Sequence, residues 1–389
     1  MTERNAPKVN RALMGQLSKA DASRAEAALK LIDKRRRADE AARRKALDDA
    51  LEHARRGLHA LVGRKKWASL QRVLRDGRTE MRLLLQPPKG LDRDPAKLDR
   101  ARRRKVEGLL EDLGVDRRSL AKIGATFRKR AAKILDGPPA GAELVHGYHT
   151  ASNLKIWDKL SPTHRVGLPW GVGLPGEDPR DPFRRFLFRP PFFEWPQRFI
   201  HDLVSDGFEV TFDSTNQGSA GSVRQDLRVR LENSGDHDLA NTSLETRQGF
   251  IFDVPADGRL EIILDAVCEL GVHDVSTENE IGWSDIEIHE TNFLTIEILH
   301  PSAPSFFIAP MSQFVNQSVG ATRHHEVLIP GEHFFAFGVG APLTAGRSVV
   351  VLIGTLTNHT SFCNDTGLDS TARFHWLLRA AEGRIRRNA

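Results

Sequence analysis

The chain has 389 residues, of which 57 are Lys or Arg and 51 are Asp or Glu, giving a formal net charge of +6. Its hydrophobic fraction of 40% is that of a folded globular protein and excludes a chain that is disordered throughout. The charge is segregated, because residues 1–140 carry a net charge of +18 and residues 141–389 a net charge of −12. This asymmetry predicts two domains with different partners, or two domains that attract one another.

Targeting and redox signals are weak. The N-terminal residues are basic but contain no apolar stretch, and the apolar run 348–356 is too short to cross a bilayer. We therefore expect synthesis in the cytoplasm without a signal peptide, no membrane span, and an unknown site of action. The two cysteines, Cys268 and Cys363, have no zinc-binding spacing. We expect buried free thiols, with a single bridge between them as the alternative.

Residues 1–140 are predicted to form a basic helical region, arranged as a bundle or hairpin. No proline occurs between Ser18 and Gln86, and strong helix formers dominate this stretch. Ser18 or Asp21 can cap its start. One apolar stripe runs along it, formed by Leu47, Leu51, Ala54, Leu58 and Leu61. Arginines replace leucines where the stripe continues towards the N-terminus, so we expect residues 33–46 to lie on a solvated helix. Two further helices are predicted, over about 94–113 and 116–135.

Basic clusters in this region suggest two kinds of partner. The candidate residues for binding nucleic acid or an acidic protein surface are Arg35, Arg36, Arg37, Arg43, Arg44, Arg64, Lys65, Lys66, Arg102, Arg103, Arg104 and Lys105. The third possibility is that they are solvated and paired along the helix, because Asp33/Arg37 and Glu52/Arg56 have the i,i+4 spacing of stabilising ion pairs. The acidic half of the chain is itself a candidate docking partner.

Residues 141–205 are predicted to be a connector rich in Pro, Gly and aromatic residues. Its prolines exclude long helices and central strands. Its phenylalanines and Trp195 are too many to leave exposed, so we expect it to pack on a domain or on a neighbouring subunit.

Residues 206–389 are predicted to form an acidic antiparallel β-sandwich, jelly-roll-like in topology. Apolar and polar residues alternate along segments near 208–212, 227–231 and 260–268. Similar runs follow near 283–299, 322–329, 332–340, 347–357 and 372–381. Eight to ten short strands with one polar and one apolar face are typical of a sandwich.

One row of side chains is the candidate ligand-binding site. On a strand, Trp283, Asp285, Glu287 and His289 point to one face, which we expect to be an open sheet face, while isoleucines point to the other. The row resembles the catalytic strand of jelly-roll laminarinase-like glycosidases, Glu-x-Asp-x-(x)-Glu, but Trp283 stands where those enzymes carry their first Glu. The alternatives are a wet sheet face, a ligand or cation site, and acid/base catalysis.

No cofactor is predicted. Two acidic segments, 273–280 and 364–369, have the composition of loops that hold Ca²⁺, although turn chemistry alone explains them. No catalytic residue is assigned, because the chain lacks the motifs of nucleophile elbows, phosphate-binding loops and zinc proteases.

The leading hypothesis is a non-enzymatic binding or structural protein. Its helices would serve assembly or docking in a homo-oligomer or larger assembly, and its sandwich would display a face for a glycan or protein ligand. The first alternative is a nucleic-acid-associated protein that binds backbone through the basic helices. The second is a carbohydrate-active enzyme on the sandwich face.

Overall fold

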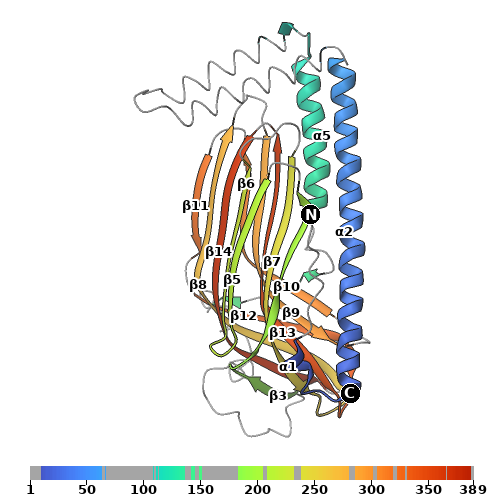
Figure 1. The fold of residues 1–389 in the computed structure, drawn as a ribbon, viewed down its shortest axis with the longest axis vertical. Coiled ribbons are helices and arrows are strands. Elements are labelled where there is room, and N and C mark those ends of the chain that lie inside the picture. Colours follow the sequence, from blue (N-terminus) through green and yellow to red (C-terminus); the bar gives the residue numbers. More distant parts are fainter. Residues whose placement is uncertain are drawn as a thin grey trace.

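The structure is mostly β-sheet, preceded by helices (Figure 1). The computed structural model describes residues 10–63, 66, 108, 111–112, 114–135, 142–144, 149–150, 183–204, 208–231, 238–279, 285–300, 305–318, 322–328, 331–364 and 366–386. None of the described helices is long and apolar enough to cross a membrane.

The described strands form two sheets. Sheet A has the order β1 (Glu143–Leu144), β10 (Ser305–Ser318), β9 (Asp285–Leu299), β13 (Ser348–Asn364), β7 (Asp238–Asp253) and β4 (Phe193–Val204). Sheet B has the order β2 (His149–Thr150), β12 (Gly331–Leu343), β8 (Gly258–Asn279), β14 (Thr366–Arg386), β6 (Ser222–Leu231) and β5 (Phe208–Gln217). Outside this order, β11 (Thr322–Leu328) pairs with β8 and β3 (Phe183–Phe188) pairs with β14. All described pairings are antiparallel except that of β1 with β10.

The segment that runs from β6 to β14 forms four strand pairs, and these pairs are nested along the chain. In sheet B, β6 pairs with β14 and β8 pairs with β12. In sheet A, β7 pairs with β13 and β9 pairs with β10. Successive pairs therefore alternate between the two sheets, from the outermost pair inwards to the connection between β9 and β10.

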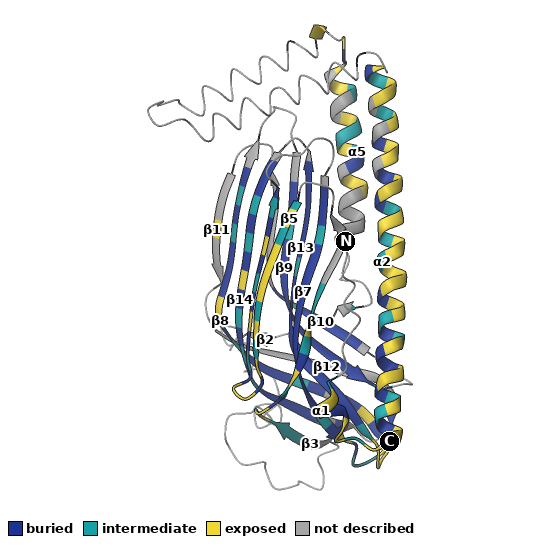
Figure 2. Ribbon diagram, in the orientation of Figure 1, coloured by how far each residue is buried: buried dark blue, intermediate teal, exposed yellow. Residues whose placement is uncertain are grey.

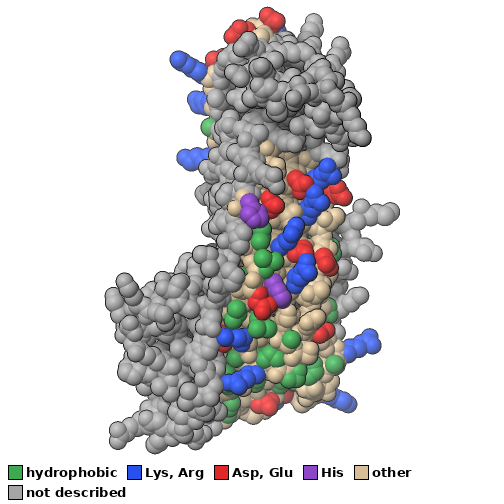
Figure 3. All heavy atoms as spheres, turned by 90° about the vertical axis from the view of Figure 1, so that its left-hand side faces the viewer, with side chains coloured by type: hydrophobic (Ala, Val, Ile, Leu, Met, Phe, Trp, Pro, Cys, Tyr) green, Lys and Arg blue, Asp and Glu red, His purple; other side chains and the backbone are tan. Residues whose placement is uncertain are grey.

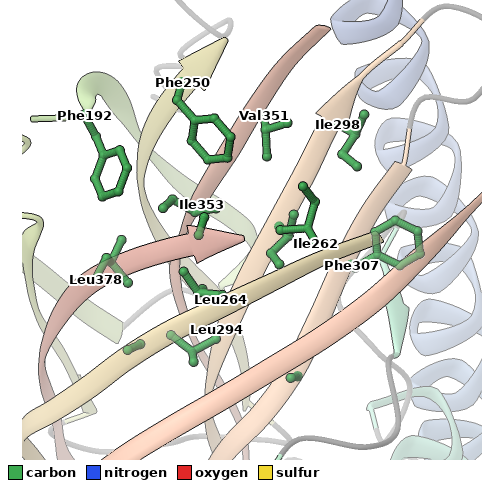
Figure 4. Close-up of a cluster of buried hydrophobic side chains, with 14 of the residues drawn as sticks. Phe192, Phe250, Ile262, Leu264, Leu294, Ile298, Phe307, Val351, Ile353 and Leu378 are labelled. Carbon is green, nitrogen blue, oxygen red and sulfur yellow. The ribbon is translucent and has the colours of Figure 1, made fainter. Parts of the chain in front are cut away.

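The apolar core fills the space between the two sheets (Figure 4). It includes Phe250, Leu294, Ile298, Val351 and Ile353 from sheet A, and Ile262, Leu264 and Leu378 from sheet B. Each strand therefore has an inner face towards the other sheet and an outer face away from it. Both cysteines are buried free thiols, as expected, and burial raises the pKa of the Cys268 thiol to about 12.

The predicted strands in 206–389 are confirmed, but the sequence did not reveal β7 or β10. Part of the predicted connector also belongs to the sheets, as β3 and β4. Pro196 is compatible with β4 because β4 is an edge strand and its register shifts between Trp195 and Arg198. Of the aromatic side chains described in this segment, Phe192 and Trp195 are buried.

Three helices are described. These are α1 (Arg11–Met14), α2 (Lys19–Val62) and α5 (Arg117–Leu135), and α2 and α5 lie side by side along the sheets (Figure 1). Of the two predicted caps for α2, Ser18 is the one used, since its side chain accepts a hydrogen bond from the Asp21 N–H. The α2 helix ends at Gly63, which has a positive φ of 76°. The predicted helix over 94–113 lies almost entirely outside the described residues.

The helices cover the outer face of sheet A. Near the start of α2, Leu29 and Ile32 pack with Leu352 of β13. Towards its end, Leu47 packs in a cluster that joins α5 to sheet A, where Phe127 contacts Phe362 with ring centroids 4.5 Å apart. In Figure 2 the side of α2 away from the sheets is exposed along most of its length. One outer face of the two-sheet body is therefore closed by the helices.

A buried ion network fixes α2 on this face. The Arg36 guanidinium is 2% exposed, donates to the Glu245 carboxylate of β7 at 3.2 Å, and lies 3.9 Å from the centroid of the Phe306 ring. Arg247 of β7 donates in turn to Glu297 of β9. Such contacts are favourable only when the buried charges are paired.

The pKa values of this network follow from its charges. Burial alone would lower the pKa of Arg36, but the carboxylates of Glu245 and Glu297 outweigh it and raise that pKa. Burial alone would raise the pKa of Glu245, but the arginines around it lower that pKa to about 2. Arg36 and Glu245 are therefore both ionised at neutral pH.

The expectation that residues 33–46 are solvated is wrong for Arg36 and its neighbours on the same side. Asp33 forms an ion pair at 3.2 Å with Arg198 of β4, and each side chain is 13% exposed. The physical reason is that charged partners on sheet A, distant in sequence, compensate the burial of charges on α2.

We predict that Arg36→Met destabilises the protein by about 3–5 kcal/mol, because it leaves Glu245 buried without one of its partners. The matched control is Arg35→Met, because the Arg35 side chain directly precedes Arg36 on the same helix and is exposed. Its loss should change the free energy of unfolding by less than about 0.5 kcal/mol. Urea unfolding of both variants measures the difference. Equal effects of the two substitutions would contradict the burial of Arg36.

Candidate functional site

The predicted row on β9 does not lie on an open sheet face. Glu287 is on the outer face of sheet A, where its side chain is 3% exposed, and it is hydrogen-bonded to His289 at 2.9 Å. Its register partner on β13 is Phe362, which lies beneath α5. The alternation was predicted correctly, but the helices cover this face and the expectation of an open one is wrong. The side chain of Asp285 and all of Trp283 are outside the described part of the chain, and ligand binding by this row stays a prediction.

The basic candidates that the structure describes differ in their exposure to solvent. Arg36 is committed to the internal network, whereas Arg35, Arg37 and Arg44 are exposed on α2 and Arg43 is half-buried. Lys66 is exposed. The remaining candidates lie outside the described residues: Arg64, Lys65, Arg102, Arg103, Arg104 and Lys105. Arg36 contacts Glu245 in the acidic half of the chain, whereas binding of a separate acidic partner or of nucleic acid stays a prediction.

The outer face of sheet B carries a groove of about 730 Å³. Its lining comes from four neighbouring strands, because alternate residues of β6, β14 and β8 point outward while Leu227, Ala372 and Val275 fill the interior. The polar lining residues are Thr211 and Asp213 of β5, Arg224, Asp226 and Arg228 of β6, Asp274 and Ser276 of β8, and Asp369, Thr371 and Arg373 of β14. Figure 3 shows the side of the molecule where β8 and β11 lie, with acidic, basic and histidine side chains close together on it.

Ion pairs organise the groove. Arg228 donates to both carboxylate oxygens of Asp369, from Nε at 3.0 Å and from an Nη at 2.6 Å. Arg224 donates to Asp226 at 2.6 Å. These hydrogen bonds raise the pKa of each arginine. Because the pairs are solvent-exposed, they contribute little to stability, and their role is to fix the direction of donors and acceptors in the groove.

An aromatic pair borders the groove at the edge of the sheets. Phe212 of β5 is 40% exposed, and its ring stacks on Phe199 of β4 with centroids 4.2 Å apart. The pair joins the edge strands of the two sheets, so it closes the gap between them and leaves one apolar surface beside the groove.

A second polar cluster lies in the interior between the sheets. The Glu290 carboxylate of β9 accepts hydrogen bonds from Nδ1 of His273 at 2.9 Å and Nδ1 of His359 at 2.8 Å, and it also accepts one from the Ser370 hydroxyl. Each of these side chains is at most 1% exposed. Burial alone would raise the pKa of Glu290, but the two histidines lower it to about 2.

This interior cluster has the residue types of a catalytic site but not the geometry of one. The carboxylate lies between the histidines and the serine, so no histidine activates the hydroxyl, as nucleophilic catalysis would require. The side chains are buried on all sides, and the groove on sheet B is lined by other residues. We interpret the cluster as a structural link that joins β8, β9, β13 and β14.

The two segments considered for Ca²⁺ are not loops where they are described. Residues 273–279 belong to β8 and residues 366–369 belong to β14. The loop geometry expected of them is therefore wrong, because strand pairing extends further than the turn-like composition suggested. Among the described residues, no group of three or more His, Cys, Asp or Glu side chains is arranged to hold a metal ion.

No protein-family model matches the chain, and no curated protein is similar to it in sequence. Three solved structures show weak similarity. The enzymatically active domain of tailspike protein 4 from bacteriophage CBA120 is 10% identical over 44% of this chain and 19% of its own, with a TM-score of 0.12. TmCBM61 in complex with β-1,4-galactotriose is 13% identical over 44% of this chain and 87% of its own, with a TM-score of 0.10. The isomalto-dextranase of Arthrobacter globiformis T6, complexed with panose, is 12% identical over 47% of this chain and 36% of its own, with a TM-score of 0.12. Scores this low carry no argument about the fold or function of this chain.

We predict that Glu290 makes the protein acid-sensitive. Its folded-state pKa of about 2 is below the ordinary value of 4.5, so its stabilising contribution is complete above the ordinary pKa and is lost as the pH falls towards 2. By pH 3 the loss from this group is about 2 kcal/mol. Urea unfolding at pH 6 and pH 3 should show a smaller difference for Glu290→Gln than for the unmodified protein.

The control for this experiment is Glu269→Gln, which removes a partly exposed carboxylate on β8 that pairs with His375. It should leave the pH dependence nearly unchanged, because exposed pairs contribute little. An identical pH dependence for the unmodified protein and Glu290→Gln would show that Glu290 does not titrate as proposed.

Proposed function

We propose that the protein is a non-enzymatic glycan-binding protein with a jelly-roll domain, whose binding site is the groove on the outer face of sheet B. The observation that carries the proposal is the asymmetry of the two outer faces. The face of sheet A is covered by α2 and α5, whereas the face of sheet B carries a groove lined by paired charges and hydroxyl groups.

The nested strand pairs support the jelly-roll assignment. A jelly roll consists of eight strands in two sheets and is a common form of lectin domain. The four pairs that lie between β6 and β14 alternate between the sheets, which is the arrangement of a long antiparallel ribbon rolled around a core. In this scheme β4 and β5 extend the two sheets at one edge.

The chemistry of the groove supports a ligand rich in hydroxyl groups. A sugar hydroxyl both donates and accepts hydrogen bonds, and the groove offers guanidinium donors, carboxylate acceptors and side-chain hydroxyls that do both. The ion pairs hold these groups in place before a ligand arrives, which reduces the entropy lost on binding. The exposed Phe212 ring at the border offers an apolar surface to the C–H groups of a sugar.

The same ion pairs support binding rather than hydrolysis. Glycoside hydrolysis needs one carboxyl group with a raised pKa to act as the acid. In the groove, Asp226 and Asp369 each form an ion pair with an arginine, so their carboxylate oxygens are already engaged as hydrogen-bond acceptors. Glu287, the carboxylate first considered for catalysis, is buried beneath the helices.

We propose in addition that the helices serve to dock the N-terminal part of the chain on sheet A. The apolar side chains of α2 pack on sheet A, and its outward side chains are largely charged. Assembly into a homo-oligomer stays a prediction.

We predict that Thr371→Trp weakens glycan binding at least tenfold. Thr371 lies between Arg228 and Asp274 in the strand register, so an indole ring there would fill the groove. Screening the full chain against a library of oligosaccharides and titrating the hits by calorimetry should give specific binding that falls at least tenfold in this variant, or about 1.4 kcal/mol.

The matched control is Thr344→Trp, which places the same side chain on the exposed connection between β12 and β13, away from the groove. It should bind as the unmodified protein does. The absence of binding to any oligosaccharide would contradict the proposal, and cleavage of a bound oligosaccharide would favour the enzymatic alternative.

A further inference from the structure

We propose that the groove recognises an acidic sugar, and that Arg373 of β14 is the residue that binds its carboxylate. This inference rests on the proposed function and names the ligand class of the same site. Arg373 lines the groove, its side chain is exposed, and it has no carboxylate partner among the described residues.

The other two basic side chains that line the groove are already paired. Arg224 is bound to Asp226 and Arg228 to Asp369. Beside the groove, His375 lies 3.2 Å from Glu269, and His325 of β11 lies 3.8 Å from Asp274.

The strand register explains why Arg373 has no carboxylate partner in the part of the chain that the structure describes. Arg373 lies opposite Asp226 of β6 and opposite Val272 of β8. The carboxylate of Asp226 is bound by Arg224, which is on the same strand two residues away. Val272 offers no charge on the other side. The guanidinium of Arg373 is therefore presented to the groove with its donors available.

A carboxylate is the group that matches these donors. The planar guanidinium binds a carboxylate through two parallel hydrogen bonds, a geometry that an ammonium group does not reproduce. A uronic acid carries one such carboxylate among several hydroxyl groups. Its hydroxyls would then face the fixed pairs of Arg228 with Asp369 and of Arg224 with Asp226.

The acidic neighbours restrict the ligand further. Asp213, Asp226, Asp274 and Asp369 all line the groove, so a densely charged polyanion would meet like charges within it. The ligand that fits is an oligosaccharide with an isolated acidic residue flanked by neutral sugars.

The test compares oligosaccharides that each contain one uronic acid with the same oligosaccharides after methyl esterification, using the full chain and calorimetry. We expect the acid to bind at least tenfold more tightly than its ester. Arg373→Gln should reduce binding of the acid to the level of the ester and leave binding of the ester unchanged. Arg373→Lys should retain part of the preference, because it keeps the charge without the paired geometry.

The control variant is Arg347→Gln, which removes an exposed arginine between β12 and β13, outside the groove, and should not change either affinity. If acid and ester bind equally, or if Arg373→Gln binds the acid as the unmodified protein does, the acidic-sugar inference is wrong and the glycan-binding function stands. If neither oligosaccharide nor any neutral one binds to the unmodified chain, the proposed function itself fails.

Discussion

The buried contact between Arg36 and Glu245 is the constraint on which the arrangement of this protein depends. A guanidinium at 2% exposure is tolerated only with a carboxylate beside it, so α2 has one favourable position on sheet A. With α2 in that position, its apolar side chains and those of α5 cover the outer face of the sheet. The groove lies on the opposite outer face, that of sheet B. The contact of Arg36 with Glu245 joins the basic N-terminal part of the chain to the acidic C-terminal part.

Polar side chains are buried on both faces of sheet A, and this specifies its register. On the outer face of β7, Glu245 and Arg247 belong to the ion network, while on its inner face Thr246 accepts a hydrogen bond from Gln225 of β6. Sliding β7 by one residue would place charges between the sheets and break both sets of contacts. The cluster around Glu290 acts in the same way on β9. These polar contacts therefore select one strand pairing, while the apolar core supplies the driving force for burial.

A strand could be predicted from the sequence only where one of its faces is exposed to solvent and the other is buried. Alternation identified β5, β6 and β8, because polar residues mark the outer face of sheet B. It failed for β7, whose polar residues are buried on both faces and look like those of a loop. Local spacing also suggested that arginines of α2 are paired along the helix, and no local signal shows that Arg36 meets a carboxylate 209 residues away. The groove was missed for the same reason, since Arg228 and Asp369 are 141 residues apart and become neighbours only through the sheet.

The central claim is that the helices cover the outer face of sheet A, whereas the outer face of sheet B is open. Carboxyl labelling of the folded full chain, measured by mass spectrometry, tests this claim most directly. Asp369, with a side chain 41% exposed, and the exposed Asp213 should be modified rapidly. Glu245 and Glu297, each 1% exposed, should remain unmodified until the protein unfolds. Modification of Glu245 and Glu297 at the rate of Asp213 in the folded protein would contradict the account, because it would mean that α2 does not cover sheet A.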